Sequence, residues 1–199
     1  MEAVIRTRRS IRRFSPEPVR PEEVRELLLD ACAAPAPHHT RPWRFAVLFD
    51  HAAKDRLARA MGEAWRADLT ADGVDTATQE RLIARSHARI TAAPVVVLAC
   101  LVDEGLRRWP DGRRQAAEWA MAQHSLGCAL ENLMLGAHLR GLASYWISAP
   151  LFCQEAVRAA LDLPAAWQPQ ALAAVGRPDP AAVPPPRPPV DLERLAVYR

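Results

Sequence analysis

Glycine is scarce in this sequence, with eight residues in a chain of 199. None of them forms a Gly-x-Gly-x-x-Gly turn or a Walker loop, the backbone cradles that hold nucleotide phosphates. No serine lies in a Gly-x-Ser-x-Gly elbow, and the six histidines do not have metalloprotease spacing. A bound nucleotide would therefore need side chains to hold its phosphate, and neither a serine hydrolase nor a zinc protease is indicated.

Paired cysteines and long apolar runs are also missing. No Cys-x-x-Cys motif occurs, and His38-His39 has no thiol nearby at metal-binding spacing. We expect all four cysteines to be reduced core residues of a cytoplasmic protein without a metal: Cys32, Cys100, Cys128 and Cys153. The longest apolar run, Pro94 to Val102, is far shorter than the ~20 residues of a bilayer span. The arginines of residues 6–13 interrupt any signal peptide, so we expect neither secretion nor a membrane.

The overall charge is small, at +3, with 50% hydrophobic and 25% charged residues. These values indicate one globular domain, whereas a nucleic-acid-binding protein usually carries a larger clustered excess of positive charge. Only Lys54 among the 26 basic residues is a lysine, and alanine and proline are abundant. This usage is typical of a GC-rich bacterial genome, so the position of an arginine is more informative than the number of arginines.

The densest cluster of arginines lies at residues 6–13, where five arginines surround Ser10. Guanidinium groups stay charged and bind phosphate in bidentate fashion. The cluster is compatible with a solvated basic arm, a nucleic-acid patch, or a pocket for one phosphate monoester such as flavin mononucleotide (FMN). Acidic residues follow at once and offset the charge, which disfavours nucleic acid: Glu17, Glu22, Glu23, Glu26 and Asp30.

Hydrophobic periodicity and capping signals predict an α+β fold, with helices around a mostly antiparallel sheet of about four to five strands. The predicted helices are 21–34, 50–69 after the cap Asp50, 76–91 with a Thr76/Gln79 capping box, 113–140 ended by Gly141, and 154–161. The predicted strands are 43–49, 94–102, 142–147 and 170–175.

Two segments suggest a partner subunit. The helix 113–140 would span ~42 Å and is rich in small residues such as Gly127, Cys128 and Gly136, which allow close approach of a neighbour. The Pro-rich stretch from residue 179 cannot form a core and should extend across a surface. We therefore expect a domain at residues 1–178, a C-terminal extension at 179–199 that packs on a partner, and a homodimer.

Four motifs, in this order, resemble the nitroreductase superfamily over residues 6–178. They are Arg-Arg-Ser-Ile-Arg-Arg-Phe-Ser (8–15), Ala-Pro-Ala-Pro-His-His-Thr-Arg-Pro-Trp-Arg-Phe (34–45), Gly-Leu-Ala-Ser-Tyr-Trp (141–146) and Val-Gly-Arg-Pro (175–178). The second motif, with residues 65–73 and 147–152, is most similar to the C-terminal domain of the coenzyme F420 biosynthesis protein FbiB. That resemblance implies FMN bound at a dimer interface and reduction of a dehydro precursor of the deazaflavin coenzyme F420.

The resemblance also assigns roles to individual residues. It implies that the FMN phosphate and ribityl chain are bound by Arg8, Arg9, Ser10, Arg12 and Arg177. It places the flavin ring of the other subunit against Pro35, Ala36, Pro37 and His39, and the backbone near the ring at Gly141 and Leu142. It implies substrate contacts at Asp68, and Trp65 could stack on a second ring system. For each of these residues an ordinary structural role, such as a solvated turn, a helix end or core packing, remains the alternative.

No side chain is required as a catalyst, because the flavin carries the hydride chemistry. The predicted activity is FMN-dependent reduction of the dehydro F420 precursor, by hydride transfer from reduced FMN to a small molecule. NAD(P)H is a candidate electron donor. The alternatives are an NAD(P)H-dependent nitro or quinone reductase, a flavin-destroying enzyme, and a non-catalytic flavin- or F420-binding protein.

Overall fold

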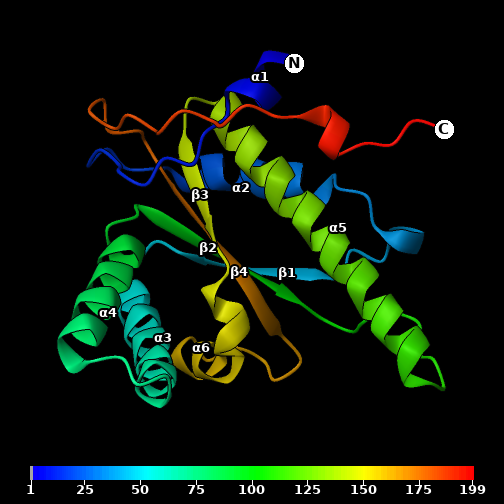
Figure 1. Ribbon diagram of the computed structural model, residues 1–199, viewed down its shortest axis with the longest axis horizontal. Coiled ribbons are helices and arrows are strands. Elements are labelled where there is room, and N and C mark those ends of the chain that lie inside the picture. Colours follow the sequence, from blue (N-terminus) through cyan, green and yellow to red (C-terminus); the bar gives the residue numbers. More distant parts are fainter. Residues whose placement is uncertain (1) are drawn as a thin grey trace.

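The computed structural model describes residues 2–199, so Met1, the first residue of the predicted 1–178 domain, lies outside the described part. Its centre is one four-stranded antiparallel sheet in the order β1-β2-β4-β3 (Figure 1). The strands are β1 (Trp43–Leu48), β2 (Val95–Leu101), β3 (Ala143–Ile147) and β4 (Gln168–Gly176). The predicted α+β class and strand number are confirmed.

Helices cover both faces of this sheet (Figure 1). The α-helices are α1 (Glu2–Thr7), α2 (Pro21–Cys32), α3 (His51–Ala71), α4 (Thr76–Thr91), α5 (Gly112–Leu139) and α6 (Gln154–Ala160). Short 3₁₀ turns are η1 (Pro37–His39), η2 (Ala149–Phe152) and η3 (Leu192–Arg194). Helix α1 has no counterpart among the elements predicted from the sequence.

Strand β2 separates two apolar layers, because side chains alternate between the faces of a strand. Val95, Val97, Ala99 and Leu101 pack with α2 and α5, whereas Val96, Leu98 and Cys100 pack with α3 and α6. All seven residues of β2 are buried, as its continuous apolar run predicts.

Helix ends follow the expected chemistry with one exception. Asp50 caps α3 by accepting a hydrogen bond from the Ala53 amide at 3.1 Å, and Gly141 follows α5 with a φ of 72°. The Thr76/Gln79 capping box is wrong. Asp75 is the N-cap of α4 and accepts from the Thr78 amide at 2.9 Å, because its carboxylate reaches the first turn from one residue earlier.

The prediction that every cysteine lies in the core is also wrong in one case. All four cysteines are free, but Cys128 is exposed on the outer face of α5, since only the inner face of this helix packs against the sheet. Along residues 2–199 no helix combines the length and apolar character needed to cross a bilayer. Over the same residues no group of three or more His, Cys, Asp or Glu side chains is placed to hold a metal ion.

Candidate cofactor and substrate site

The arginine-rich residues 6–13, which we call the basic segment, lie along the free edge of β3. Ser10 forms a parallel bridge with Ser144, and the Ile11 amide donates a hydrogen bond to the Ser144 carbonyl at 3.2 Å. The Arg12 guanidinium lies over the Tyr145 ring, 5.7 Å from its centroid. The predicted phosphate-binding residues are therefore held by backbone pairing to the strand that follows Gly141.

The sheet topology adds the last motif to this edge. Strand β4 pairs with β3 so that Gly176 lies opposite Ala143, and the Ser15 amide donates to the Arg177 carbonyl at 3.0 Å. The structure thus brings together, at one end of the sheet, seven of the predicted residues: Arg8, Arg9, Ser10, Arg12, Gly141, Leu142 and Arg177.

Arg8 carries the most informative contact pattern in this group. Its Nε forms an ion pair with Glu131 of α5 at 3.2 Å, and its side chain is 18% exposed. Its Nη1 is buried and, among residues 2–199, has no hydrogen-bond partner. A buried donor without an acceptor costs about 1–3 kcal/mol, and a phosphate oxygen is an acceptor that would remove this cost. The residues present therefore fit the phosphate of FMN.

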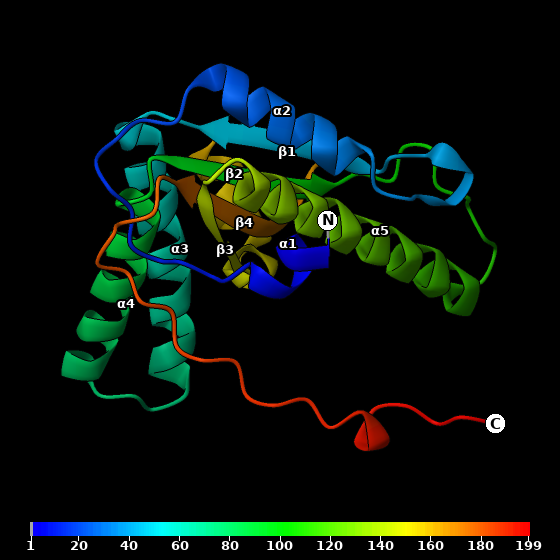
Figure 2. The same cartoon turned by 90° about the horizontal axis from the view of Figure 1, so that it is seen from above.

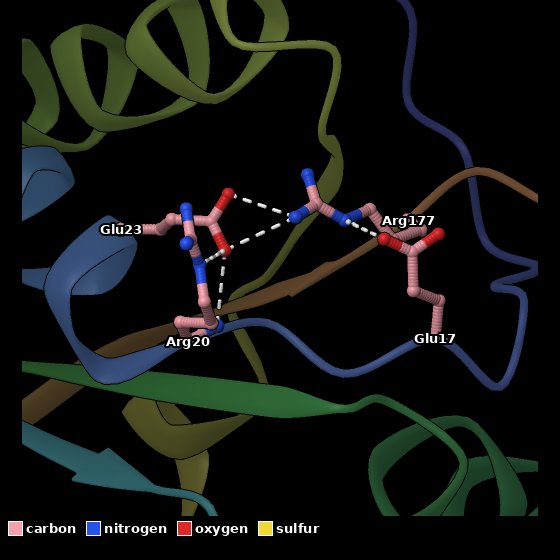
Figure 3. Close-up of polar contacts among 4 residues, drawn as sticks. All are labelled: Glu17, Arg20, Glu23 and Arg177. Atoms are coloured by element: carbon pink, nitrogen blue, oxygen red, sulfur yellow. Dashed lines mark hydrogen bonds and ion pairs between the residues drawn. The ribbon is translucent and has the colours of Figure 1, made fainter.

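Arg177 is held by acidic residues near the start of α2 (Figure 3). Its Nη2 donates to both carboxylate oxygens of Glu23, at 2.8 and 3.1 Å, and its Nε lies 3.1 Å from a Glu17 oxygen. Glu23 also accepts from the Arg20 amide at 3.0 Å, which completes the capping box of α2. These contacts fix the Arg177 guanidinium beside the basic segment through Nη2, whereas the buried Nε is near Glu17 but, in residues 2–199, makes no hydrogen bond.

The two predicted substrate residues line one cavity of about 620 Å³ between α3, α4 and η2. Its wall consists of Met61, Trp65, Asp68, Asp72, Leu82, Arg85, Ser86, Arg89, Ser148, Ala149, Phe152 and Cys153. The hydroxyl of Tyr145 donates to the Arg89 carbonyl at 2.6 Å, so the residue that packs under Arg12 also supports the cavity wall. Burial raises the pKa of the Cys153 thiol, with a further contribution from Asp68, and the thiol stays protonated at neutral pH.

The second motif, which contains the loop 35–39, does not join the others within one chain. Turn η1 packs against α5, whose Glu118 carboxyl group has a lowered pKa. The largest contribution to that shift is the hydrogen bond from Trp109, followed by the Arg107 amide. Because α5 rises ~1.5 Å per residue, the helix separates Glu118 from Gly141 by roughly 34 Å. Figure 2 shows η1 beside the first turns of α5, away from the end of the helix that leads to Gly141.

Backbone strain marks this loop. His38, His39 and Arg41 have φ values of 54°, 55° and 46°, in the left-handed region that non-glycine residues rarely adopt. A second cavity of about 280 Å³ lies beside the loop and is lined by Cys32, Ala33, Ala34, Pro35, Ala36, His39 and Arg41. Strained residues at a cavity are typical of positions selected for function.

The sequence profile of the nitroreductase family matches residues 5–177. The chain belongs to the nitroreductase family. This confirms the predicted family, and the protein is an oxidoreductase of that family. The matched residues include the basic segment, the loop 35–39, Gly141 and Leu142, and Arg177.

Individual nitroreductase relatives cover almost the whole chain. It is 30% identical to an NADH dehydrogenase of Thermus thermophilus, over 96% of this chain and 92% of the relative. It is 29% identical to a 5,6-dimethylbenzimidazole synthase of Rhodospirillum rubrum, over 89% of this chain and 82% of the relative. Among solved structures, a nitroreductase-like protein of Desulfovibrio desulfuricans in complex with FMN superposes with a TM-score of 0.74 at 25% identity, over 100% of this chain and 95% of the other.

Several residues around this candidate site were not predicted from the sequence. Arg85 and Arg89 line the cavity from successive turns of α4, and Glu131 and Tyr145 hold the basic segment. The spacing of four residues between Arg85 and Arg89 was a visible signal, because it places both on one helix face. Nothing local distinguishes Glu131 from the other acids of the chain.

Proposed function

We propose that this nitroreductase uses FMN and binds the cofactor phosphate with Arg8, Arg9, Ser10, Arg12 and Arg177. The observation that carries this proposal is the buried, unpartnered Nη1 of Arg8 at the point where the predicted residues meet. FMN, when bound, would supply the redox chemistry by accepting a hydride from a donor and passing it to a substrate. The protein's own residues bind and orient the cofactor and exclude water.

The flavin ring would extend from the phosphate site along Gly141 and Leu142. Gly141 is exposed, and a Cβ atom built on it would meet nothing within 4 Å in residues 2–199. A planar ring can therefore approach the backbone at this point. Arg12, stacked over Tyr145, would link the phosphate end of the site to β3, the strand that follows the proposed position of the flavin ring.

The complete site would need two copies of the chain. Within one chain the loop 35–39 lies beside the start of α5, far from the chain's own basic segment (Figure 2). In a dimer that packs the exposed faces of α5 together in antiparallel orientation, each loop would approach the partner's Gly141. His39 and the Pro-Ala-Pro segment would then cover the partner's flavin, as the family motif predicts.

The cavity between α3, α4 and η2 would hold the substrate. Its volume of about 620 Å³ accommodates a fused ring system, and Trp65 is an aromatic surface on which such a ring can stack. Arg85 and Arg89 would contact anionic groups, and Asp68 would accept hydrogen bonds from ring N–H groups. We propose the dehydro precursor of coenzyme F420 as this substrate, with NAD(P)H as a candidate donor to FMN.

The test begins with purification and titration of the protein with FMN. A yellow protein that binds FMN supports the cofactor, and a colourless protein that fails to bind it refutes the proposal. Incubation with chemically reduced FMN and the dehydro F420 precursor should yield a product two mass units heavier. Oxidation of NAD(P)H with a nitroaromatic or quinone, without conversion of the precursor, would instead favour a general reductase.

A second candidate is fragmentation of the flavin itself. It is favoured by the relative named 5,6-dimethylbenzimidazole synthase, at 29% identity. Dimethylbenzimidazole contains a dimethylbenzene ring with nitrogens on two neighbouring carbons, and the same unit is present in flavin. Reduced FMN exposed to oxygen in the presence of the protein distinguishes the two. Stable flavin refutes fragmentation, and loss of flavin with appearance of a dimethylbenzimidazole supports it.

A further inference from the structure

Tyr145 of β3 contacts both the basic segment and the helix α4. Its side chain is buried, at 2% exposure. The Phe14 ring stacks on the Tyr145 ring with the centroids 5.9 Å apart, and the Arg12 guanidinium lies 5.7 Å from the same centroid. At the end of the ring, the phenol hydroxyl donates to the Arg89 carbonyl of α4 at 2.6 Å. One side chain therefore connects the predicted phosphate site with a helix that forms a wall of the cavity.

The carbonyl that accepts this hydrogen bond belongs to the last turn of α4. The last four carbonyls of an α-helix have no amide donor within the helix and need another partner. In the described part of the chain no backbone amide donates to the Arg89 carbonyl, whereas the Ala92 amide donates to the Ala88 carbonyl at 3.0 Å. Burial raises the pKa of Tyr145 most, against smaller effects of the Arg89 and Arg12 charges, so the hydroxyl remains a donor at neutral pH. The phenol thus caps the end of α4 from β3.

The residue held by this hydrogen bond also brings a positive charge to the cavity. The Arg89 side chain lines the cavity from α4, one helical turn beyond Arg85. Asp68 and Asp72 line it from the end of α3. Among residues 2–199 none of these four side chains forms an ion pair. The Arg89 guanidinium is therefore available to an anionic ligand, and its backbone is fixed by Tyr145.

A second side chain holds the backbone that follows α4, and it comes from a different element. Lys54 of α3 donates to the carbonyls of Ala93 and Pro94, at 2.7 and 3.1 Å. Lys54 is not among the residues that line the cavity, and neither are the two residues that it holds. Of these two anchors, Tyr145 is thus the one that holds a residue of the cavity wall. A comparison of the two separates a loss of stability from a loss of position.

We propose that Tyr145 is a positioning residue for anionic groups of the substrate and that it acts through Arg89. The proposal rests on the proposed use of the cavity as the substrate site, and it assigns a role to a residue that does not itself line the cavity. The hydrogen bond fixes the Arg89 backbone relative to β3, so less conformational freedom is lost when the guanidinium binds an anion. Because Phe14 and Arg12 pack on the same ring, the strand that holds the basic segment also sets the position of the last turn of α4.

The experiment compares an anionic probe, 4-nitrobenzoate, with its neutral counterpart 4-nitrobenzamide. Isothermal titration calorimetry on the protein as purified gives the Kd of each probe without turnover. The variants are Tyr145→Phe, which keeps the ring and removes the hydroxyl, Arg89→Ala, the double variant, and the control Lys54→Met. We expect Tyr145→Phe to raise the Kd for 4-nitrobenzoate about fivefold to tenfold and to leave the Kd for 4-nitrobenzamide unchanged. Lys54→Met should leave both constants unchanged, although it removes an anchor of the same backbone.

The double variant tests whether Tyr145 acts through Arg89. In the Arg89→Ala background, Tyr145→Phe should cause no further loss of 4-nitrobenzoate affinity, because the positioned group is already absent. Additive losses, equal losses for both probes, or the same loss in Lys54→Met would each show a general structural effect and overturn the proposal.

The wild type alone supplies two further outcomes. If it did not prefer 4-nitrobenzoate to 4-nitrobenzamide, Arg89 would not bind anions and the proposal would also be overturned. A protein that binds no FMN would instead refute the proposed cofactor, whereas the probe titrations, which require no hydride transfer, would still decide the role of Tyr145. The two failures are therefore distinguishable, and cooperative thermal melting above the titration temperature confirms that each variant is folded.

Discussion

Arg177 and Glu23 form a two-point contact in which one guanidinium nitrogen lies 2.8 and 3.1 Å from the two carboxylate oxygens. The pair ties the end of β4 to the first turn of α2 (Figure 3). The hydrogen bond from the Arg20 amide lowers the pKa of Glu23 most, burial opposes this with the second-largest effect, and Arg177 lowers the pKa further. Both side chains are mostly buried, with 21% and 14% exposure, so the pair should matter for stability.

Glu23→Gln tests that pair without breaking the helix cap, since a glutamine oxygen can still accept from the Arg20 amide. We expect the free energy of unfolding to fall by about 1–3 kcal/mol in urea titrations. Because the folded pKa of Glu23 lies below its ordinary 4.5, its contribution is present above that pH and is lost as the pH falls through the folded pKa. Glu17→Gln, at a 65% exposed partner, should change stability by less than about 1 kcal/mol. Equal losses of unfolding free energy in Glu23→Gln and Glu17→Gln would argue against a special contribution of the Arg177–Glu23 pair.

Lys54→Met should destabilise the protein by about 1–3 kcal/mol. Lys54 is 4% exposed, and its ammonium donates to the carbonyls of Ala93 and Pro94, at 2.7 and 3.1 Å, which methionine would leave without this partner. Burial lowers the pKa of Lys54 in the folded protein below 10.5. As the pH approaches the folded pKa, the unfolded chain therefore binds more protons than the folded one, and the stability of the wild type rises with pH relative to the variant. Paired urea titrations at pH 7.5 and 9.5 measure the gap. If the difference in unfolding free energy between wild type and Lys54→Met became smaller at higher pH, the lowered pKa of Lys54 would be contradicted.

Gly176→Ala should disturb the basic segment. A Cβ atom at residue 176 would lie 2.6 Å from Phe14 Cδ1 and 2.8 Å from Pro94 Cδ, so Phe14 and its stack on Tyr145 would have to move. We expect a loss of about 1–3 kcal/mol in stability together with weaker FMN binding. Gly112→Ala is the matched control, because a Cβ there meets nothing within 4 Å in residues 2–199. If Gly176→Ala bound FMN as tightly as the wild type, the position of Phe14 would not matter for FMN binding.

Gly127→Arg tests the proposed dimer. Gly127 lies on α5 beside the exposed Cys128, and a Cβ there meets nothing within 4 Å in residues 2–199 of one chain. The arginine should therefore be tolerated by the single chain but block close packing of a second α5. We expect sedimentation to shift from dimer to monomer, with loss of FMN. Ala84→Arg, on the exposed face of α4, should leave the dimer intact. A variant that remains dimeric and loaded with FMN would refute an interface at α5.

His39→Gly should separate stability from activity. The φ of 55° at His39 costs roughly 1–2 kcal/mol for a residue with a side chain, and glycine relieves this strain. We expect melting at or above the wild-type temperature but slower turnover with NAD(P)H, if His39 covers the partner's flavin. His38→Gly relieves a similar φ of 54° at a position with no predicted flavin contact, and it should keep full activity. Equal turnover of both variants would remove His39 from the site.

Much of the fold could be predicted from the sequence. The continuous apolar run of β2, the Asp50 cap and the Gly141 stop depend on neighbouring residues, so they were predicted correctly. The cap of α4 was misplaced by one residue, because Asp75 and Thr76 are both good caps and only the folded geometry selects between them. Cys128 was misplaced because an apolar pattern does not reveal which face of a long helix lacks a neighbour.

The sequence by itself determined which residues can bind phosphate: it contains an arginine-rich segment and lacks a glycine-rich loop, and both are local chemical facts. Only the tertiary structure decided what surrounds them. The strand order β1-β2-β4-β3 brings Arg177 to Ser15, and chain reversal after β4 brings Arg187 to Arg8. The length of α5 separates the loop 35–39 from the basic segment and from Arg177. These relationships depend on contacts between residues more than a hundred positions apart, for which no local pattern in the sequence provides a signal.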